Sequence, residues 1–483
     1  MLIAVFDTAE YFDPTGSDAI GDCAETVLNP TPNNTQQPQT RAINQHNATC
    51  CHLADLVENA AFRGDRENHR QRVPTYTLGK FLMNMERITS QTTTQAVRAG
   101  NLIFVGGQMS LDEQGRVVGS DITTQARHAF DALKRVLAEA GASMSDVVKH
   151  NIYFHCDGDD AAVAKFLEEL DQVRLTYFSD PGPTTTETRV GLDREGALIL
   201  IDAWAVVGES KERLMPEGHW NWSKPLPFSH GWKVGDMIFV GGQRSLDAQG
   251  RVLGVGDIEV QTDHAFRNLD TLLQAGGGDR HSLMRQNTYF RFFGQGREVT
   301  DYWEKMTNVR RRYMSIPSAA GAGLRITGFP NAQELIQVEG IGVLGENKQR
   351  LQPDNHWDWS IPNTQFTQGW RIGNLAFIGG QISADNKAQA VGQDMETQTR
   401  NVFQFIRSVL REGGLDESDV AKLYIYYHAP GDWSQVAETK ATIAAVQREF
   451  YPEPGPCSTA IRVSGFAFED LLIEIEALAV CRV

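Results

Sequence analysis

One segment recurs three times along this chain, and it constrains the fold more than any other feature. The heptapeptide Leu-Ile-Phe-Val-Gly-Gly-Gln at residues 102–108 returns almost unchanged at 237–243 and 375–381. The copies are separated by roughly 135 residues, far more than the period of about 20–50 residues that marks a solenoid. Each unit is long enough to bury a core of its own. The sequence therefore predicts three similar domains in series.

The repeats divide the chain at residues 83–208, 209–345 and 346–483. Repeats 2 and 3 open with matching lead-in segments, His219-Trp-Asn-Trp222 and His356-Trp-Asp-Trp359, which repeat 1 lacks. A flexible linker does not need two tryptophans, so we expect these segments to pack against a neighbouring domain.

The first 82 residues do not resemble the repeats. They are rich in Asn, Gln, Thr and Asp and show little periodicity, as in Asn29–Pro38. This composition predicts a flexible N-terminal extension that buries too little apolar surface to order itself. A start at Met83 or Met85, which would leave the extension outside the native protein, is an alternative hypothesis.

Each repeat shows the same order of elements. In repeat 3 the apolar residues Val402, Phe405, Ile406, Val409 and Leu410 have helical spacing, and the segment Leu471–Ala479 alternates as a strand does. The order βββαβαββ predicts an α+β domain with a mixed sheet and two helices on one face. The other sheet face must meet water or a partner sheet.

Composition excludes several classes of function. A net charge of −16 argues against nucleic-acid binding, which needs a concentrated basic surface. No apolar run reaches the roughly 20 residues that span a bilayer. The six cysteines show neither metal-ligand nor disulfide spacing, so we expect a reduced, cytoplasmic protein with no metal and no cofactor.

The heptapeptide, the helix start Gln398–Val402 and the ending Leu472–Val480 together resemble the YjgF/RidA family of reactive-intermediate (enamine/imine) deaminases. The resemblance covers all three repeats. It implies chorismate-mutase-like domains that assemble as trimers around a central β-barrel, with clefts for small molecules between neighbours. Three fused copies would then form an intrachain pseudo-trimer, which can pair further.

The chain departs from the family at the arginine that clamps a substrate carboxylate. Family members carry it in a Pro-x-Arg motif at the head of the penultimate strand. The matching positions here are Thr185, Gly321 and Ser458. The departure marks a non-standard subgroup and argues against the standard amino-acid-derived imines as substrates.

The three copies differ in sequence at one position of the last strand. The family's water-positioning glutamate matches Glu474 in repeat 3, whereas repeat 1 has Leu200 and repeat 2 has Gln337. Repeat 3 is therefore the predicted contributor to hydrolysis. Glu474 would hold or deprotonate the attacking water, and Ser458 or Thr459 would hydrogen-bond the substrate; a solvated carboxylate on the polar sheet face is the alternative for Glu474.

An arginine recurs four residues after the clamp position, as Arg189, Arg325 and Arg462. Strand alternation places Ser458, Ala460 and Arg462 on one face and the apolar Ile461 and Val463 on the other, which we expect to pack under the helices. The arginines would then point toward the centre or the clefts. They are either displaced anion clamps or partners of Glu339 or Glu476 in a structural ring.

Further residues complete the predicted site. Gly380 and Gln381 are expected to border a cleft by analogy with the family. Aromatic residues near the first strand predict apolar clefts suited to a larger or aromatic ligand: Phe228, Trp232, Phe366 and Trp370.

Three functions remain open at this point. The chain can be a deaminase-type hydrolase that acts on a small imine, enamine or related C–N electrophile at one competent cleft. It can be a non-catalytic protein of the same fold that binds a ligand or a partner. It can also be a specialised enzyme of biosynthesis or catabolism acting on an aromatic or cyclic acid, which is an analogy of fold alone.

Overall fold

The three repeats have the predicted order of elements. The computed structural model describes residues 84–90, 93–354, 356–357 and 367–481, which lie in one compact unit spanning residues 75–483. The predicted extension 1–82, the alternative start Met83 and the predicted site residue Phe366 lie outside the described residues. No helix in the described part is long and apolar enough to cross a membrane.

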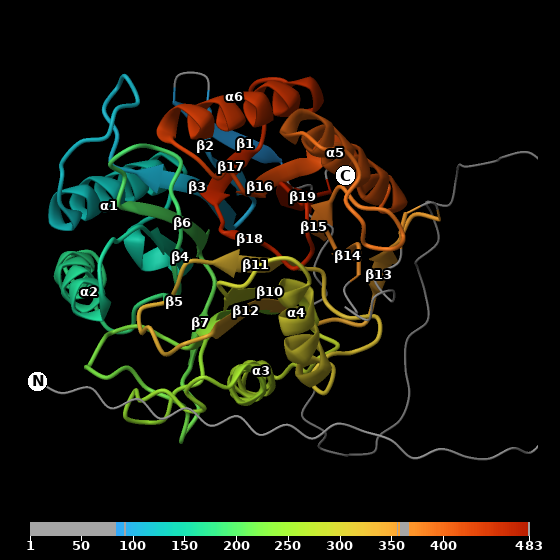
Figure 1. The fold of residues 1–483 in the computed structure, drawn as a ribbon. Helices are drawn as coiled ribbons and strands as arrows, with labels where there is room; N and C mark the ends of the chain where they lie inside the picture. The colour runs from blue at the N-terminus through green and yellow to red at the C-terminus, as the bar shows by residue number, and fades with distance from the viewer. Residues whose placement is uncertain (1–83, 91–92, 355, 358–366, 482–483) are drawn as a thin grey trace, which may run out of the picture. The chain divides into compact units, whose positions relative to one another are not determined.

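Each repeat contributes a mixed sheet and two helices (Figure 1). Repeat 1 consists of β1 (Met85–Ser90), β2 (Thr93–Ala99), β3 (Leu102–Met109), α1 (Ile122–Glu139), β4 (Val147–Phe154), α2 (Asp160–Arg174), β5 (Thr184–Arg189) and β6 (Ile199–Val206). Repeat 2 consists of β7 (Lys211–Leu214), β8 (Gly231–Val234), β9 (Met237–Gln243), α3 (Ile258–Ala275), β10 (Leu283–Arg291), α4 (Arg297–Arg310), β11 (Gly323–Ile326) and β12 (Ile336–Val343). Repeat 3 consists of β13 (Lys348–Leu351), β14 (Gly369–Ile372), β15 (Leu375–Ile382), α5 (Met395–Glu412), β16 (Val420–Tyr427), α6 (Trp433–Phe450), β17 (Cys457–Arg462), β18 (Gly465–Phe466) and β19 (Ile473–Val480). Two short 3₁₀ turns precede β4 and β16 (Met144–Asp146 and Glu417–Asp419).

The sheets share one topology. The strand order in repeat 1 is β1-β2-β3-β6-β4-β5, and β13-β14-β15-β19-β16-β17 repeats it. Among the strand pairs of the described residues, only β4–β5, β10–β11 and β16–β17 are parallel, as the intervening helix requires. The short β18 of repeat 3 pairs antiparallel with β11 and forms the edge of the second sheet, so a segment of repeat 3 is hydrogen-bonded into the sheet of repeat 2.

The first helix of each repeat starts at the same kind of residue. Asp121, Asp257 and Asp394 are the N-caps of α1, α3 and α5, and each carboxylate accepts a backbone N–H of the first turn. The buried stripe of α5 includes Phe403, whereas the predicted Phe405 lies at its margin against His356, with ring centroids 4.5 Å apart. The helix was thus predicted at its correct place with one residue of its apolar face misassigned.

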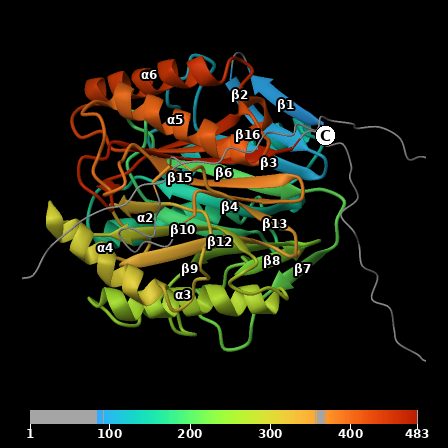
Figure 2. The ribbon, with the colours of Figure 1, turned by 90° about the vertical axis from the view of Figure 1, so that its right-hand side faces the viewer.

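Both faces of each sheet are buried. The helices cover one face, as α5 and α6 cover the sheet of repeat 3 (Figure 2). The other faces meet in a single apolar core with residues from all three repeats, where Trp204 lies 5.7 Å from Phe239 and donates from its indole nitrogen to the hydroxyl of Tyr424. The predicted partner of each second sheet face is therefore another repeat.

The predicted sidedness of β17 is wrong. Ile461 and Val463 belong to the core shared by the three repeats, while Ala460 packs toward the helices and Arg462 lies over the ring of Trp433 in α6. The alternation itself was predicted correctly. Because both faces are buried, an apolar set does not reveal which face the helices cover.

Candidate functional site

The repeated glycines mark three equivalent junctions between repeats. The backbone of Gly106 lies against Ser458 of repeat 3, that of Gly241 against Thr184 and Thr185 of repeat 1, and that of Gly379 against Gly321 of repeat 2. We name these contacts the 3–1, 1–2 and 2–3 junctions after the repeats that they join. A side chain at any of these glycines would collide with the backbone of the neighbouring repeat, which explains why the heptapeptide needs glycine there.

The second glycine of each pair lies under a side chain of its own repeat. Leu200 covers Gly107, Gln337 covers Gly242 and Glu474 covers Gly380. Each junction thus combines the clamp position of one repeat with the glutamate position of the next. The 3–1 junction has Ser458 with Leu200, the 1–2 junction has Thr185 with Gln337, and the 2–3 junction has Gly321 with Glu474.

This pairing corrects the site expected from the sequence. Glu474 and Ser458 were predicted to act together, but the structure places them in different junctions. Thr459 is fully buried on the core side of β17, beside Asp202 of repeat 1, and does not join Glu474 either. Strand β16 separates β17 from β19 in the sheet, so the two ends of one repeat face different neighbours.

Glu474 is a buried carboxyl group at the 2–3 junction. It is 5% exposed, and the backbone N–H of Gly323 in repeat 2 donates a hydrogen bond to it. Burial, reinforced by the nearby Glu476 carboxylate, raises the pKa of Glu474 well above its usual value, and the Gly323 hydrogen bond offsets only part of the shift. A carboxyl group with a raised pKa keeps its proton to a higher pH than usual, so it can give a proton as well as take one.

The raised pKa of Glu474 predicts a measurable pH dependence of stability. The native-state pKa of Glu474 lies above the unfolded-state pKa of 4.5, so the protonated carboxyl group contributes its full share of the unfolding free energy below pH 4.5. This stability is lost as the pH rises through the native-state pKa. The neutral variant Glu474→Gln is therefore expected to gain stability relative to wild type as the pH increases. Urea unfolding of both proteins from about pH 5 to about pH 9 measures the difference; a constant difference would contradict the shift.

The 1–2 junction contains cavities. A small inner cavity touches Gly241, Gly242, Thr185 and Gln337, and a larger one of about 650 Å³ shares Glu187, Trp222 and Arg244 with it. Two arginines line the larger cavity. Arg174 is held by Asp171 and by Glu187, and Arg244 donates to Glu334 from its Nε and Nη2 atoms.

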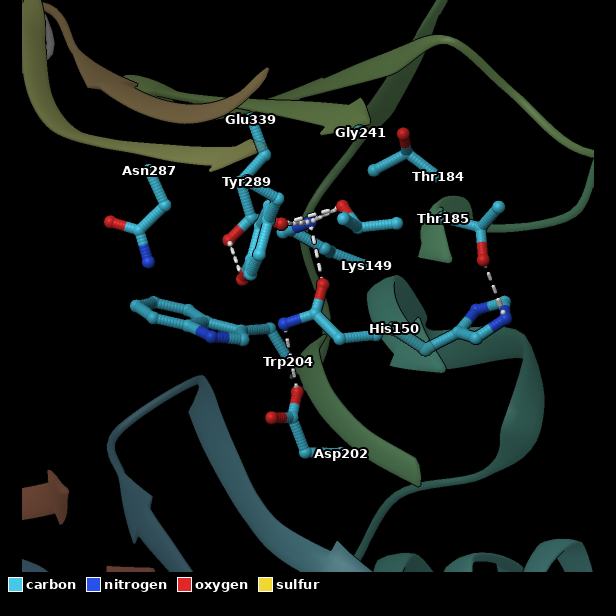
Figure 3. A network of polar contacts seen from close by, with 12 residues as sticks. Lys149, His150, Thr184, Thr185, Asp202, Trp204, Gly241, Asn287, Tyr289 and Glu339 are labelled. Atoms are coloured by element: carbon cyan, nitrogen blue, oxygen red, sulfur yellow. Dashed lines mark hydrogen bonds and ion pairs between the residues drawn. The ribbon is translucent and has the colours of Figure 1, made fainter. Parts of the chain in front are cut away.

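The clamp position of the 1–2 junction is occupied by a hydroxyl. Thr185 lies 2.9 Å from Nε2 of His150, as Figure 3 shows. Burial, with the nearby Arg174 and Lys149, lowers the pKa of His150 well below its usual value, so this imidazole is neutral. Its ring stacks on Phe178 at 5.3 Å. The pair is a packed, uncharged element and does not replace the missing arginine.

Close packing at the 1–2 junction leads to a prediction about Gly241. In the variant Gly241→Ala the new methyl group would meet the carbonyl oxygen of Thr185 at 2.8 Å. Because that atom is backbone and cannot swing away, we expect a loss of about 1–3 kcal/mol in unfolding free energy. Chemical unfolding measures it, and Gly455→Ala, where the nearest atoms lie at 3.4 Å or more and φ is likewise not positive, controls for the lost glycine flexibility. Equal losses in the two variants would contradict the close approach.

The remaining predicted residues mostly have structural contacts. Gln381 is buried and bonded to His356 at 2.7 Å and to Gln368, so it ties the lead-in segment to the sheet. Trp232 and Trp370 donate across the junctions to the carbonyl oxygens of Gly182 and Ser318. Phe228 packs into the core of repeat 1, with Arg174 4.2 Å above its ring.

The lead-in segment of repeat 2 packs as predicted. Trp222 stacks on His230 at 4.8 Å and also contacts the core of repeat 1. His219 bonds to Gln243 at 2.8 Å, which matches the contact of His356 with Gln381 in repeat 3. These histidines therefore position the glutamine of the heptapeptide.

A model of one protein family matches the chain three times. It is described as endoribonuclease L-PSP and covers residues 86–207, 223–319 and 360–481. The chain belongs to this family. The expected resemblance to YjgF/RidA proteins in three tandem copies is confirmed by the matches and by the relatives that follow.

Each curated relative corresponds to about one repeat. A RutC family protein of Pyrococcus abyssi is 35% identical over 113 residues, which are 23% of this chain and 84% of the relative. The 3-aminoacrylate deaminase RutC of Acinetobacter baylyi is 34% identical over 113 residues, which are again 23% of this chain and 84% of the relative. The 2-iminobutanoate/2-iminopropanoate deaminase of Salmonella typhimurium is 28% identical over 120 residues, which are 24% of this chain and 88% of the relative.

One solved structure aligns with most of the chain. The crystal structure of a chorismatase covers 69% of this chain and 93% of its own, at 14% identity and a TM-score of 0.46.

A central group of ion pairs was missed in the sequence and ties the three repeats of this family member together. Lys149 of repeat 1 bonds Glu339 of repeat 2 at 2.8 Å, and Arg285 of repeat 2 bonds Glu476 of repeat 3 at 2.7 Å (Figure 3 shows the first). Lys422 of repeat 3 lies 3.5 Å from Asp202 of repeat 1. Arg285 also bonds Glu339 at 3.0 Å. We call these six residues the central ion-pair ring.

The central ion-pair ring rules out one of the two roles predicted for the recurring arginines, a salt bridge to Glu339 or Glu476. Glu339 and Glu476 are occupied by Lys149 and Arg285, so they do not pair with Arg189, Arg325 or Arg462. Burial opposes the charge on Glu339, but Lys149 and Arg285 lower its pKa to about 2. The predicted salt-bridge partners were therefore wrong, and the three arginines lie elsewhere.

Proposed function

We propose that the chain is a hydrolase of the enamine/imine deaminase type that acts at the 2–3 junction. One observation carries the proposal: the carboxyl group of Glu474, the counterpart of the family's glutamate, lies buried against Gly380 and Gly323 with a raised pKa. Two of the relatives described above are deaminases of 3-aminoacrylate and of 2-iminobutanoate or 2-iminopropanoate. Their substrates define the chemical class to be tested.

The chemistry requires a group that moves protons. Water forms a bond to the C=N carbon as the π electrons of the double bond pass to nitrogen, which takes up a proton. The resulting amino alcohol loses ammonia when the C–N bond breaks and a carbonyl forms. Glu474 would relay the protons from water to nitrogen, a role that typically contributes about 10²–10⁴-fold to a rate. The N–H of Gly323 would orient the carboxyl group.

The absence of a clamp arginine at Gly321 limits the substrate. Gly321 is packed against the backbone of Gln286 and offers no charge to a carboxylate, which favours a neutral or weakly anionic C–N electrophile over a standard 2-imino acid. The direct test is ammonia release from a panel of freshly generated imines and enamines with and without a carboxylate. We expect acceleration over buffer, and the absence of acceleration for every member would overturn the proposal.

At the 1–2 junction a different observation favours binding without hydrolysis. Gln337 occupies the glutamate position there and cannot act as a base, whereas the cavity of about 650 Å³ is lined by Arg174 and Arg244. We propose that this junction holds a polar ligand without converting it. Ligands that bind there should do so equally well in wild type and in a Glu474→Gln variant.

We also propose that the three repeats replace the three subunits of the trimers that are typical of the family. The central ion-pair ring uses the same two positions of every repeat, each pairing with the next repeat. Sedimentation equilibrium should then give the mass of one chain or of a pair of chains. A mass of three chains would contradict the proposal.

A further inference from the structure

The recurring arginines lie where the penultimate strands of the three repeats end against one another. The N–H of Arg189 donates to the carbonyl of Gly328, and the N–H of Gly191 donates to the carbonyl of Arg462. The N–H of Ser464 donates to the carbonyl of Arg325. Each of the three strand ends is therefore bonded to the following repeat. This place is four residues along the strand from the clamp position, roughly 13 Å from the junctions described above.

A cavity of about 340 Å³ opens at these strand ends. Its polar lining comes from all three repeats: His155 and Arg189 from repeat 1, Thr327 from repeat 2, and His428, Arg462 and Ser464 from repeat 3. The cavity is thus completed only when the three repeats are together.

The lining carries positive charge that is not balanced locally. Among the described residues neither Arg189 nor Arg462 forms an ion pair; Arg189 contacts the carbonyl of Gly158 at 3.4 Å, and Arg462 lies 5.2 Å from the ring of Trp433. The acidic residue of the lining is Asp157, whose side chain is 93% exposed and faces His155. In a chain with a net charge of −16, such a cluster is not a by-product of composition.

Arg325 extends the positive field, and His428 lies beside it as a neutral imidazole. Arg325 is half-buried and donates to the carbonyls of Gly294 and Ser464, both at 3.0 Å. Burial, with the nearby Arg325 and Arg462, lowers the pKa of His428, although its contact with the carbonyl of Val463 works against this shift. An anion placed here would be attracted by the guanidinium groups of Arg189, Arg325 and Arg462.

One lining group has an unused hydrogen-bonding capacity. The hydroxyl oxygen of Ser464 is buried and has no hydrogen-bond partner among the residues that the structure describes. A buried hydroxyl without a partner is costly and is rarely left so in a native protein. Together with the two guanidinium groups it provides the donors that a tetrahedral oxyanion accepts.

We propose that this cavity is a binding site for a small dianion of the phosphate type, either free phosphate or the phosphate group of a small metabolite. Arg189 and Arg462 supply two positive charges that a dianion neutralises, and Ser464 supplies a hydroxyl donor. The site is separate from the junctions and does not depend on the proposed deaminase activity. Because all three repeats line it, the bound anion stabilises their association by mass action.

The test is calorimetric titration of the full chain with inorganic phosphate and, separately, with glycerol 3-phosphate. We expect saturable binding of at least one probe and a rise in the unfolding temperature with its concentration. Tighter binding of glycerol 3-phosphate would identify a phosphorylated metabolite as the ligand, and equal binding would identify phosphate itself. Binding of neither probe would overturn the proposal.

Variants of the lining residues test whether the anion binds in this cavity. The double variant Arg189→Gln/Arg462→Gln should weaken binding by at least about tenfold, since charge-assisted hydrogen bonds are lost. The matched control Arg116→Gln/Arg251→Gln removes the same charge from two exposed turns and should leave binding unchanged. Ser464→Ala should weaken binding without changing the charge. Equal affinity in the Arg189/Arg462 variant and its control would show that no such site exists.

Discussion

Replacing Glu474 by glutamine is expected to reduce the rate of ammonia release by at least about 100-fold on any imine or enamine that the wild type hydrolyses. Glutamine has nearly the same shape, so it can still lie on Gly380 and accept the N–H of Gly323. It cannot give or take a proton under these conditions. The loss should therefore appear in kcat rather than in KM, as measured by steady-state ammonia release.

The equivalent position in repeat 2 supplies the matched control. Gln337 covers Gly242 at the 1–2 junction as Glu474 covers Gly380 at the 2–3 junction. The variant Gln337→Leu, which reproduces the residue of repeat 1, should leave kcat within about twofold of the wild type because no proton passes through the amide. Equal rates for wild type and Glu474→Gln would remove Glu474 from the mechanism, and a large loss in Gln337→Leu would move the reaction to the other junction.

Replacing Arg285 by methionine is expected to destabilise the chain by about 3–5 kcal/mol, because it leaves the buried carboxylate of Glu476 without its counter-charge. Arg285 is 2% exposed and bonds Glu476 twice, at 3.0 and 2.7 Å, in addition to Glu339. After the change Glu476 would keep only neutral partners, Asn287 and Tyr426. Chemical unfolding followed by tryptophan fluorescence measures the loss.

Two further variants test whether the lost counter-charge causes the destabilisation in Arg285→Met. Arg267→Met breaks an exposed pair with Asp263 on the surface of α3 and should cost less than about 1 kcal/mol. Arg285→Met combined with Glu476→Leu removes the stranded carboxylate and should recover most of the stability, as replacements of buried ion pairs by apolar residues do. If Arg285→Met unfolds at the same urea concentration as wild type, the central ion-pair ring does not hold the repeats together.

The fold could be predicted from the sequence because its signals are local and repeated three times. The glycine pairs at 106–107, 241–242 and 379–380 indicated the three repeats, and the helical spacing from Val402 to Leu410 predicted the first helix after the heptapeptide. Errors arose where a choice between two buried faces was needed. Ile461 and Val463 are apolar in either environment, so their alternation could not distinguish the shared core from the layer under the helices.

The arrangement of the site could be predicted only in part. Glu474 was identified by its position in the last strand, but its partner was sought in the same repeat. The partner lies at Gly323 in repeat 2, and nothing in one repeat's sequence reveals which neighbour its strand end will meet. A contact between repeats that are roughly 135 residues apart in sequence follows from the closure of three sheets on one core and not from local pattern.

The central ion-pair ring did leave a signal in the sequence. Lys149, Arg285 and Lys422 are basic residues at the third position of the strand regions that begin at residues 147, 283 and 420, in otherwise largely apolar surroundings. Charged residues are almost never fully buried unless they are paired. Three such residues at equivalent positions therefore indicate partners at three equivalent positions, which are Asp202, Glu339 and Glu476.

The measurement that tests the central claim most directly is a crystal structure of the chain soaked with the stable carbonyl product of its best imine substrate. If the reaction occurs between repeats 2 and 3, the product will lie within hydrogen-bond distance of the Glu474 carboxyl group and the N–H of Gly323. Product found only in the cavity between repeats 1 and 2, beside Arg174 and Arg244, would contradict it.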